Sequence, residues 1–144
     1  MDLNNQIALV TGAARGIGKA SAKILGEHGA HVVIADLNEA LAQEAAREFE
    51  QAGISAEGLL LDVADPSSIS GVIADVVARH GQIDILVNNA GIVNFNSVGE
   101  TTLEEWDRVI DINLRGVHLC SQTVIKHMIS RRRGKIVNLA SMGG

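Results

Sequence analysis

The sequence predicts an α/β protein built on a doubly wound parallel sheet. Along its 144 residues, short runs of apolar and β-branched residues alternate with longer segments that have the period of a helix. Runs such as Val32 to Ala35 are apolar without a break, which is typical of strands covered by helices on both faces. A glycine cluster joins the first strand to the first helix. No repeat or linker interrupts the alternation, so we expect one domain over residues 1–144.

The expected strands and helices follow one another in strict order. Strands are expected at residues 7–11, 31–36, 58–61, 83–87 and 135–140. Helices are expected at residues 17–28, 39–51, 66–81 and 103–131. Asp65 can cap the third helix, because Pro66 suits its first position. The basic run from Arg131 to Arg133 is expected to be a solvated helix end.

Composition excludes several classes of function. The net charge is −5, whereas a protein that binds nucleic-acid phosphates presents a basic face. The single cysteine cannot form an internal disulfide, and the five histidines lack metal-ligand spacing, so we expect no metal site. No apolar run approaches the roughly 18 residues that span a bilayer, and the amino terminus lacks a secretory signal. We therefore expect a cytoplasmic protein that binds neither nucleic acid nor membrane.

The glycine cluster from Thr11 to Gly18 directly follows the first strand and opens a helix. Glycine lets the backbone approach a ligand closely, and the N–H groups at a helix start favour a pyrophosphate. The phosphate loop of nucleoside triphosphatases is excluded, because Ala13 and Ala20 stand where it needs Gly and Ser or Thr. The G-x-G-x-x-G order is also absent. By itself the turn fits a dinucleotide site and a tight strand–helix connection equally well.

Asp36 ends the second strand, eighteen residues after Gly18. A carboxylate at this position can accept hydrogen bonds from an adenosine ribose, and it repels a 2′-phosphate. It therefore favours NAD over NADP. Arg15 argues mildly the other way, because its guanidinium could meet that phosphate. The alternative for Asp36 is a solvated carboxylate or a cap for the next helix.

Asn113 lies on an apolar stripe of the long fourth helix. Such a stripe predicts a buried face, and an amide there costs roughly 1–3 kcal/mol unless it is hydrogen-bonded. Spacing alone leaves open whether Asn113 is a core residue or a functional one. The stripe comprises Leu103, Trp106, Ile110, Asn113, Val117, Cys120 and Val124.

Over essentially all of its length, the chain resembles the short-chain dehydrogenase/reductase family. Within the family it is most similar to the 3-oxoacyl-carrier-protein reductases and to related sugar, polyol and steroid dehydrogenases. The residues that carry the resemblance are Thr11-Gly12-Ala13-Ala14-Arg15-Gly16-Ile17-Gly18, Asp36, Asp62-Val63, Asn88-Asn89-Ala90-Gly91, Asn113 and Ile136-Val137-Asn138-Leu139-Ala140-Ser141.

The resemblance implies a Rossmann-type sheet of strand order 3-2-1-4-5, normally continued by two further strands. It implies an oxidoreductase that transfers a hydride between NAD(P) and a small-molecule carbonyl or secondary alcohol, and a homo-oligomer when the chain is full length. Asn113 would position a water for proton relay, and Ser141 would hydrogen-bond the substrate oxygen. The implied cofactor-binding residues are Gly12, Arg15, Gly16, Ile17, Gly18, Asp36, Asp62, Val63, Asn89 and Gly91.

One departure from the family concerns the proton donor. In the family this is a tyrosine in a Y-x-x-x-K pair around a dozen residues after the serine. The sequence has no tyrosine and ends three residues after Ser141. We therefore expect a chain truncated before the last strands of the sheet, inactive or nearly so on its own. The alternative is a non-catalytic dinucleotide-binding or sensing module.

Overall fold

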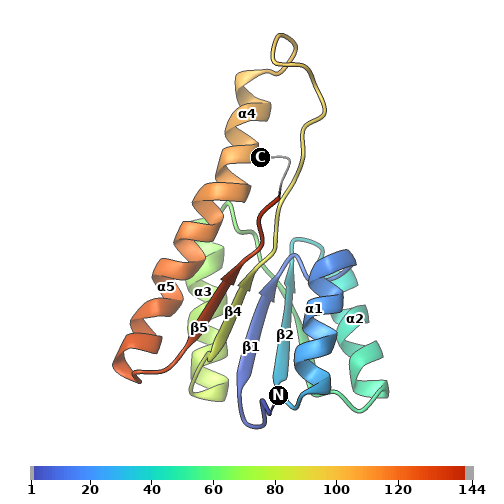
Figure 1. Ribbon diagram of the computed structural model, residues 1–144, viewed down its shortest axis with the longest axis vertical. Helices are drawn as coiled ribbons and strands as arrows, with labels where there is room; N and C mark the ends of the chain where they lie inside the picture. Colours follow the sequence, from blue (N-terminus) through green and yellow to red (C-terminus); the bar gives the residue numbers. More distant parts are fainter. Residues whose placement is uncertain (1, 142–144) are drawn as a thin grey trace.

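The computed structural model describes residues 2–141 and contains one five-stranded parallel sheet (Figure 1). Its strand order is β3-β2-β1-β4-β5, which confirms the predicted α/β fold and the order that the family resemblance implied. The strands are β1 (Ile7–Thr11), β2 (His31–Asp36), β3 (Ala56–Leu60), β4 (Ile85–Asn88) and β5 (Lys135–Asn138).

Helices cover both faces of the sheet, and each face has its own apolar core. The helices α1 (Gly16–Glu27) and α2 (Glu39–Gln51) pack on one face, and α3 (Pro66–His80) and α5 (Gly116–Ser130) pack on the other. The helix α4 (Leu103–Ile110) and the π-helical turn η1 (Asp111–Arg115) lead into α5. Among residues 2–141, every helix is too short or too polar to cross a bilayer.

The central strand β1 is buried along its whole length. Val10 pairs with Ile34 of β2 on one side and with Val87 of β4 on the other. Such two-sided burial explains why these strands are continuously apolar in the sequence. Because the strands are parallel, the carboxyl ends of β1, β2 and β4 all lie at the same end of the sheet.

Local capping signals set several helix starts. Asp65 caps α3 as predicted, since its Oδ1 accepts a hydrogen bond of 2.8 Å from the Ser67 N–H. Asn38 caps α2, whose bounds match the expected residues 39–51. A capping box joins Thr102 and Glu105 at the start of α4. Hydrogen bonds from the Thr102 N–H and the Asn96 amide hold the pKa of Glu105 below its ordinary value.

Strand boundaries differ from the expected ones where pairing decides them. β3 begins at Ala56 rather than residue 58, because Ala56 and Glu57 pair with Val32 and Val33 of β2 despite the polar side chain of Glu57. β4 begins at Ile85 rather than residue 83, and β5 ends at Asn138 rather than residue 140.

The long fourth helix was expected to be buried along one stripe, but its first part, α4, has no buried residue. Leu103 and Trp106 are 77% and 59% exposed, because α4 projects beyond the sheet (Figure 1). The prediction holds only in α5, where Cys120 and Val124 are buried against the sheet. Between the two parts lies η1, a wider turn that periodicity did not predict.

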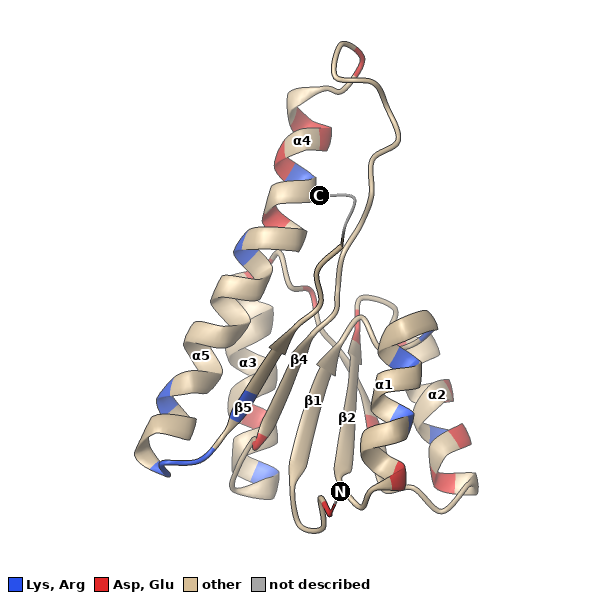
Figure 2. Ribbon diagram, viewed as in Figure 1, with Lys and Arg blue, Asp and Glu red and all other residues tan. Residues whose placement is uncertain are grey.

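The expected solvated helix end at Arg131 is also wrong. Basic residues do gather at the foot of α5 (Figure 2). However, the Arg131 Nη2 donates to Oδ1 of the buried Asp84 at 2.9 Å and to Gln82 Oε1 at 2.7 Å. Oδ2 of the same carboxylate accepts from the Ile7 N–H at 2.9 Å. Arg131 is therefore an internal partner of the β1–β4 pair, whereas Arg132 and Arg133 are exposed.

Candidate functional site

A cavity of about 620 Å³ opens at the carboxyl ends of the strands, where open α/β sheets bind ligands. Its walls come from the loops after β1, β2, β3 and β4 and from η1. Of the residues predicted to bind a cofactor, seven line it: Gly12, Arg15, Asp36, Asp62, Val63, Asn89 and Gly91.

The glycine turn needs its glycines for two different reasons. Gly12 has a φ of +62°, and a Cβ there would lie 2.8 Å from Ala90 Cα. A Cβ on Gly18 would collide with the Gly12 carbonyl oxygen, so Gly18 lets α1 pack closely against the turn. Gly16 has a φ of +58° with open space around it, and Ile17 is exposed. Gly16, Ile17 and Gly18 form the start of α1 and, unlike Gly12 and Arg15, are not among the residues that line the cavity.

The amino terminus of α1 differs from that of the neighbouring helix α2. Arg15 occupies the N-cap position without a side-chain hydrogen bond to the first turn, which runs from Gly16 to Lys19 without a carboxylate. In α2, by contrast, the Asn38 side chain accepts from the Leu41 N–H. The free N–H groups of α1 suit an anionic ligand.

Asp36 connects the glycine turn to the second strand. Its Oδ2 accepts a hydrogen bond of 3.1 Å from the Ala14 N–H, and its Oδ1 accepts one of 3.0 Å from the Asn38 N–H. The carboxylate therefore does hold the start of the α2 region, which was the structural alternative for this residue. It also lines the cavity, so the structural role and a ligand-binding role are compatible.

Asn89 and Thr11 fasten the end of β4 to the glycine turn. The Asn89 Nδ2 donates to the carbonyl oxygens of Thr11 and Gly12, both at 2.9 Å. Thr11 Oγ1 accepts from the N–H groups of Asn89 and Ala90 at 3.1 and 3.0 Å. The sequence analysis did not predict this role for Thr11. A hydroxyl side chain at the junction of an apolar strand and a glycine turn was the feature that could have indicated it.

Asp62 and Val63 form the wall beyond β3. Asp62 Oδ1 accepts from the Ala64 N–H at 2.8 Å, which turns the chain at the cavity. Val63 is buried against Gly116, where an added Cβ would lie 2.8 Å from the Val63 carbonyl oxygen. The first residue of α5 is thus held directly against this wall.

Asn113 lies in the middle of η1 and is exposed rather than buried, so the predicted core position is wrong. Its amide nevertheless makes two hydrogen bonds with the backbone of Ile92. Oδ1 accepts from the Ile92 N–H at 2.9 Å, and Nδ2 donates to the Ile92 carbonyl oxygen at 2.8 Å. The π turn therefore places this amide against the segment that follows β4, beside Gly91. Such turns often occur at functional sites.

Ser141 follows β5 at the same edge of the sheet and is exposed. The end of β5 is held by the side chain of Asn88, a contact that the sequence did not predict. Asn88 Nδ2 donates to Asn138 Oδ1 at 2.8 Å and to Ser121 Oγ at 3.0 Å. These bonds link β4, β5 and α5 at Asn138, three residues before Ser141.

A family model described as short chain dehydrogenase matches residues 6–144. The chain belongs to the short-chain dehydrogenase family. Among curated members, it is 40% identical to 3-oxoacyl-(acyl-carrier-protein) reductase FabG of Escherichia coli strain K12, over 100% of this chain and 58% of that protein. It is 39% identical to cyclopentanol dehydrogenase of Comamonas sp., over 99% of this chain and 57% of that protein.

The three-dimensional structure gives the same result. A solved structure described as the crystal structure of gox2181 superposes with a TM-score of 0.96 at 36% identity, over 99% of this chain and 56% of that one. An uncharacterized oxidoreductase of Thermotoga maritima is 39% identical over 96% of this chain and 54% of its own length. The chain thus spans little more than half the length of these relatives.

Proposed function

We propose that the chain binds NAD in preference to NADP in the cavity at the carboxyl ends of β1, β2 and β4. The observation that carries this proposal is the position of Asp36, whose carboxylate lines the cavity and also anchors the glycine turn. A carboxylate there accepts hydrogen bonds from ribose hydroxyls and repels a 2′-phosphate. Arg15 lines the same cavity and is the feature that favours NADP.

The residues present fit a dinucleotide. Gly12 leaves no room for a side chain between the turn and Ala90, so the glycine lets the turn pack directly against the loop after β4 where both line the cavity. The uncapped start of α1 offers N–H groups to a pyrophosphate, and Asp62 and Val63 form the wall at the adenine end. Gly16, Ile17 and Gly18 would shape the pyrophosphate side, and Asn89 and Gly91 the wall along the adenosine.

For the whole protein we propose hydride transfer between the nicotinamide and a small carbonyl compound or secondary alcohol. A bound nicotinamide ring supplies or accepts the hydride, and the protein supplies orientation and a proton. Ser141 would hydrogen-bond the substrate oxygen. Asn113 would act from η1, because the second lone pair of its Oδ1 can accept a hydrogen bond from a relay water.

The 144 residues have no tyrosine, which is the proton donor of the family. We therefore propose that this chain alone binds the cofactor and supports little or no turnover. The alternative function, a binding or sensing module without chemistry, rests on the same cavity. The two differ in whether a chain extended by a Y-x-x-x-K segment gains activity.

A titration of NADH and NADPH, followed by cofactor fluorescence, tests the binding proposal. We expect tighter binding of NADH, and an Asp36→Asn variant that binds NADH about 10- to 100-fold more weakly, because a hydrogen bond to a charged group contributes about 1.5–3 kcal/mol. Asp107→Asn is the matched control, because Asp107 is exposed on α4. Equal affinity of Asp36→Asn and the unsubstituted protein for NADH would contradict the proposal.

A second assay tests catalysis. NADH oxidation by residues 1–144 is followed by absorbance with cyclopentanone and with a 3-oxoacyl thioester. We expect binding without turnover. Steady turnover would show that the family's tyrosine is dispensable here and would overturn the proposed inactivity, whatever the binding titration shows.

A further inference from the structure

A second cluster of ionisable side chains lies at the opposite end of the strands from the cofactor cavity. His31 is the first residue of β2, Glu57 belongs to β3, and His80 is the last residue of α3. The cofactor cavity lies at the carboxyl ends of the strands, whereas this cluster lies near the amino ends of β2 and β3. We refer to His31, Glu57 and His80 as the basal cluster.

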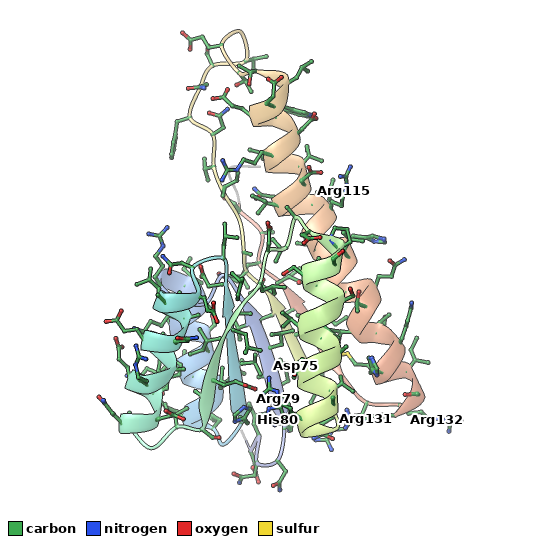
Figure 3. All side chains as sticks on the ribbon, turned by 180° about the vertical axis from the view of Figure 1, so that it is seen from behind. Asp75, Arg79, His80, Arg115, Arg131 and Arg132 are labelled. Atoms are coloured by element: carbon green, nitrogen blue, oxygen red, sulfur yellow. The ribbon has the colours of Figure 1, made fainter. Side chains whose placement is uncertain are left out.

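The sheet register brings two members of the basal cluster to one face. Val33 pairs with Glu57, so His31, two residues before Val33, lies on the same face of the sheet as Glu57. That face is the one covered by α3, whose last residue contributes His80. Figure 3 shows His80 with Asp75 and Arg79 along the lower end of α3.

The three side chains converge on one oxygen atom. Glu57 Oε1 lies 3.3 Å from His31 Nε2 and 2.8 Å from His80 Nε2. All three candidate ligand atoms lie within 4.8 Å of one another, and the two imidazole ring centroids are 4.5 Å apart. Ligands about 2.1 Å from a tetrahedral zinc ion are about 3.4 Å apart, so small side-chain adjustments would admit the ion.

Further side chains orient these ligands. His31 Nδ1 lies 2.7 Å from Ser55 Oγ. When an ion replaces the hydrogen bond between His31 Nε2 and Glu57, a proton carried by Nδ1 and donated to this hydroxyl leaves the Nε2 lone pair for the ion. Arg79 donates to Glu57 Oε2, which leaves Oε1 to face the imidazoles. Arg79 Nη1 also lies 3.4 Å from His80 Nε2, a contact that a bound ion would replace. Asp75 Oδ2 accepts from Arg79 Nε at 3.0 Å and from Nη2 at 2.8 Å. Metal ligands in proteins are commonly held by such outer partners.

The charges around Glu57 keep its carboxylate ionised. Burial by itself raises the pKa of Glu57, but hydrogen bonds from Arg79, His80 and His31 outweigh it, so the pKa lies below its ordinary value. Arg79 and Asp75 stabilise each other's charged forms, which raises the pKa of Arg79 and lowers that of Asp75. Each member of the cluster is about one-fifth exposed, so an ion can enter from solvent.

We propose that the basal cluster of His31, Glu57 and His80 binds a divalent transition-metal ion, and that Zn²⁺ is the ion its donor set fits. Two imidazole nitrogens and one carboxylate oxygen are a known zinc ligand set that leaves a fourth position for water. The bound ion would fasten the edge strand β3 to β2 and α3. This inference does not rest on the proposed cofactor site.

The histidine spacing along the sequence did not predict the site. His31 and His80 are 49 residues apart, and Glu57 comes from a third element. Metal-ligand motifs are recognised when ligands are close in sequence or lie on one helix. Here the ligands meet only because β2 and β3 pair and α3 returns across the same face.

Zinc titration of the tag-free, chelator-treated protein tests the proposal. We expect one saturable equivalent of Zn²⁺, reported by competition with a chromophoric chelator, and a rise in Tm on binding. The variants His80→Gln and Glu57→Gln each retain a polar side chain of similar size, and each should weaken Zn²⁺ binding about tenfold or more. His118→Gln is the matched control, because His118 is exposed on α5.

The competing outcomes are distinct. Equal Zn²⁺ affinity in the unsubstituted protein, His80→Gln and His118→Gln would mean adventitious surface binding and would overturn the proposal. Absence of a saturable equivalent in the unsubstituted protein would do the same. Co²⁺ provides a readout that needs no variant: we expect visible bands of a four-coordinate ion, and a spectrum of hydrated Co²⁺ alone would refute the site. NADH affinity should be the same with and without Zn²⁺.

Discussion

The inner strands of the sheet and the segment of residues 92–115 bury their apolar side chains to very different extents. β1 is buried throughout, and β2 is buried at every residue except its two ends. In the segment 92–115, which contains α4 and η1, Phe95 and Val98 are 93% and 98% exposed. Figure 1 shows this segment projecting beyond the sheet.

The projecting segment is ordered by local hydrogen bonds in place of a core. Asn113 holds the backbone of Ile92 through two bonds, and Glu105 accepts from the Asn96 amide at 3.0 Å. Such bonds contribute little to global stability when they are exposed. Most of the free energy of unfolding therefore comes from the sheet and the helices packed on it, and residues 92–115 contribute little to it.

The largest expected effect comes from Leu9→Ala in β1. Leu9 is fully buried, so we expect a loss of about 2–5 kcal/mol in the free energy of unfolding, from lost burial and the cavity left behind. Leu103→Ala is the matched control in the projecting segment and should change it by less than about 0.5 kcal/mol. Urea unfolding followed by circular dichroism measures both. Similar losses in the two variants would show that residues 92–115 contribute as much to the free energy of unfolding as the sheet does.

Cys120 belongs to the buried part of the long helix. Burial raises the pKa of its thiol from 9.0 to about 11, and the thiolate is the reactive form. Below both values, at pH 8, the folded protein should be alkylated by iodoacetamide about a hundredfold more slowly than the unfolded chain, before any further slowing by restricted access. Mass spectrometry of timed samples measures the two rates. Equal alkylation rates in the folded and unfolded chains would show that the thiol of Cys120 is exposed.

Two glycines on helices are expected to respond to alanine with opposite signs. Gly18→Ala should destabilise the protein by about 1–3 kcal/mol and weaken NADH binding, because the new Cβ collides with the Gly12 carbonyl oxygen. Gly71→Ala on α3 should stabilise by about 0.5–1 kcal/mol, since open space surrounds its Cβ position in the described chain. Thermal unfolding compares them. A stabilising Gly18→Ala would show that α1 can shift away from the turn.

The smallest global effect is expected for Asn113→Ala. Both lost hydrogen bonds are exposed, so the free energy of unfolding should fall by less than about 1 kcal/mol. The Ile92 N–H, however, should exchange with deuterium faster, because its acceptor is removed. Hydrogen exchange read by NMR resolves that amide. A loss of several kcal/mol would show that η1 unfolds together with the sheet.

Much of the architecture was predictable because periodicity and capping are local properties. The alternation of apolar runs with helical segments predicted the α/β class, and Glu39–Gln51 and the Asp65 cap were predicted without error. The glycine turn and Asp36 indicated where a dinucleotide would lie, because both stand directly after strands whose ends meet. The strand order itself followed from the family resemblance.

Contacts between residues far apart in the chain could be seen only in the tertiary structure. Asp84 accepts from the Ile7 N–H across 77 positions, and this pair draws Arg131 inward from an expected solvated end. The same applies to Asn113, for which the apolar stripe predicted burial, and to the basal cluster assembled from β2, β3 and α3. Local sequence determines which face of an element is apolar. Only sheet pairing and helix packing determine which polar groups those faces bring together.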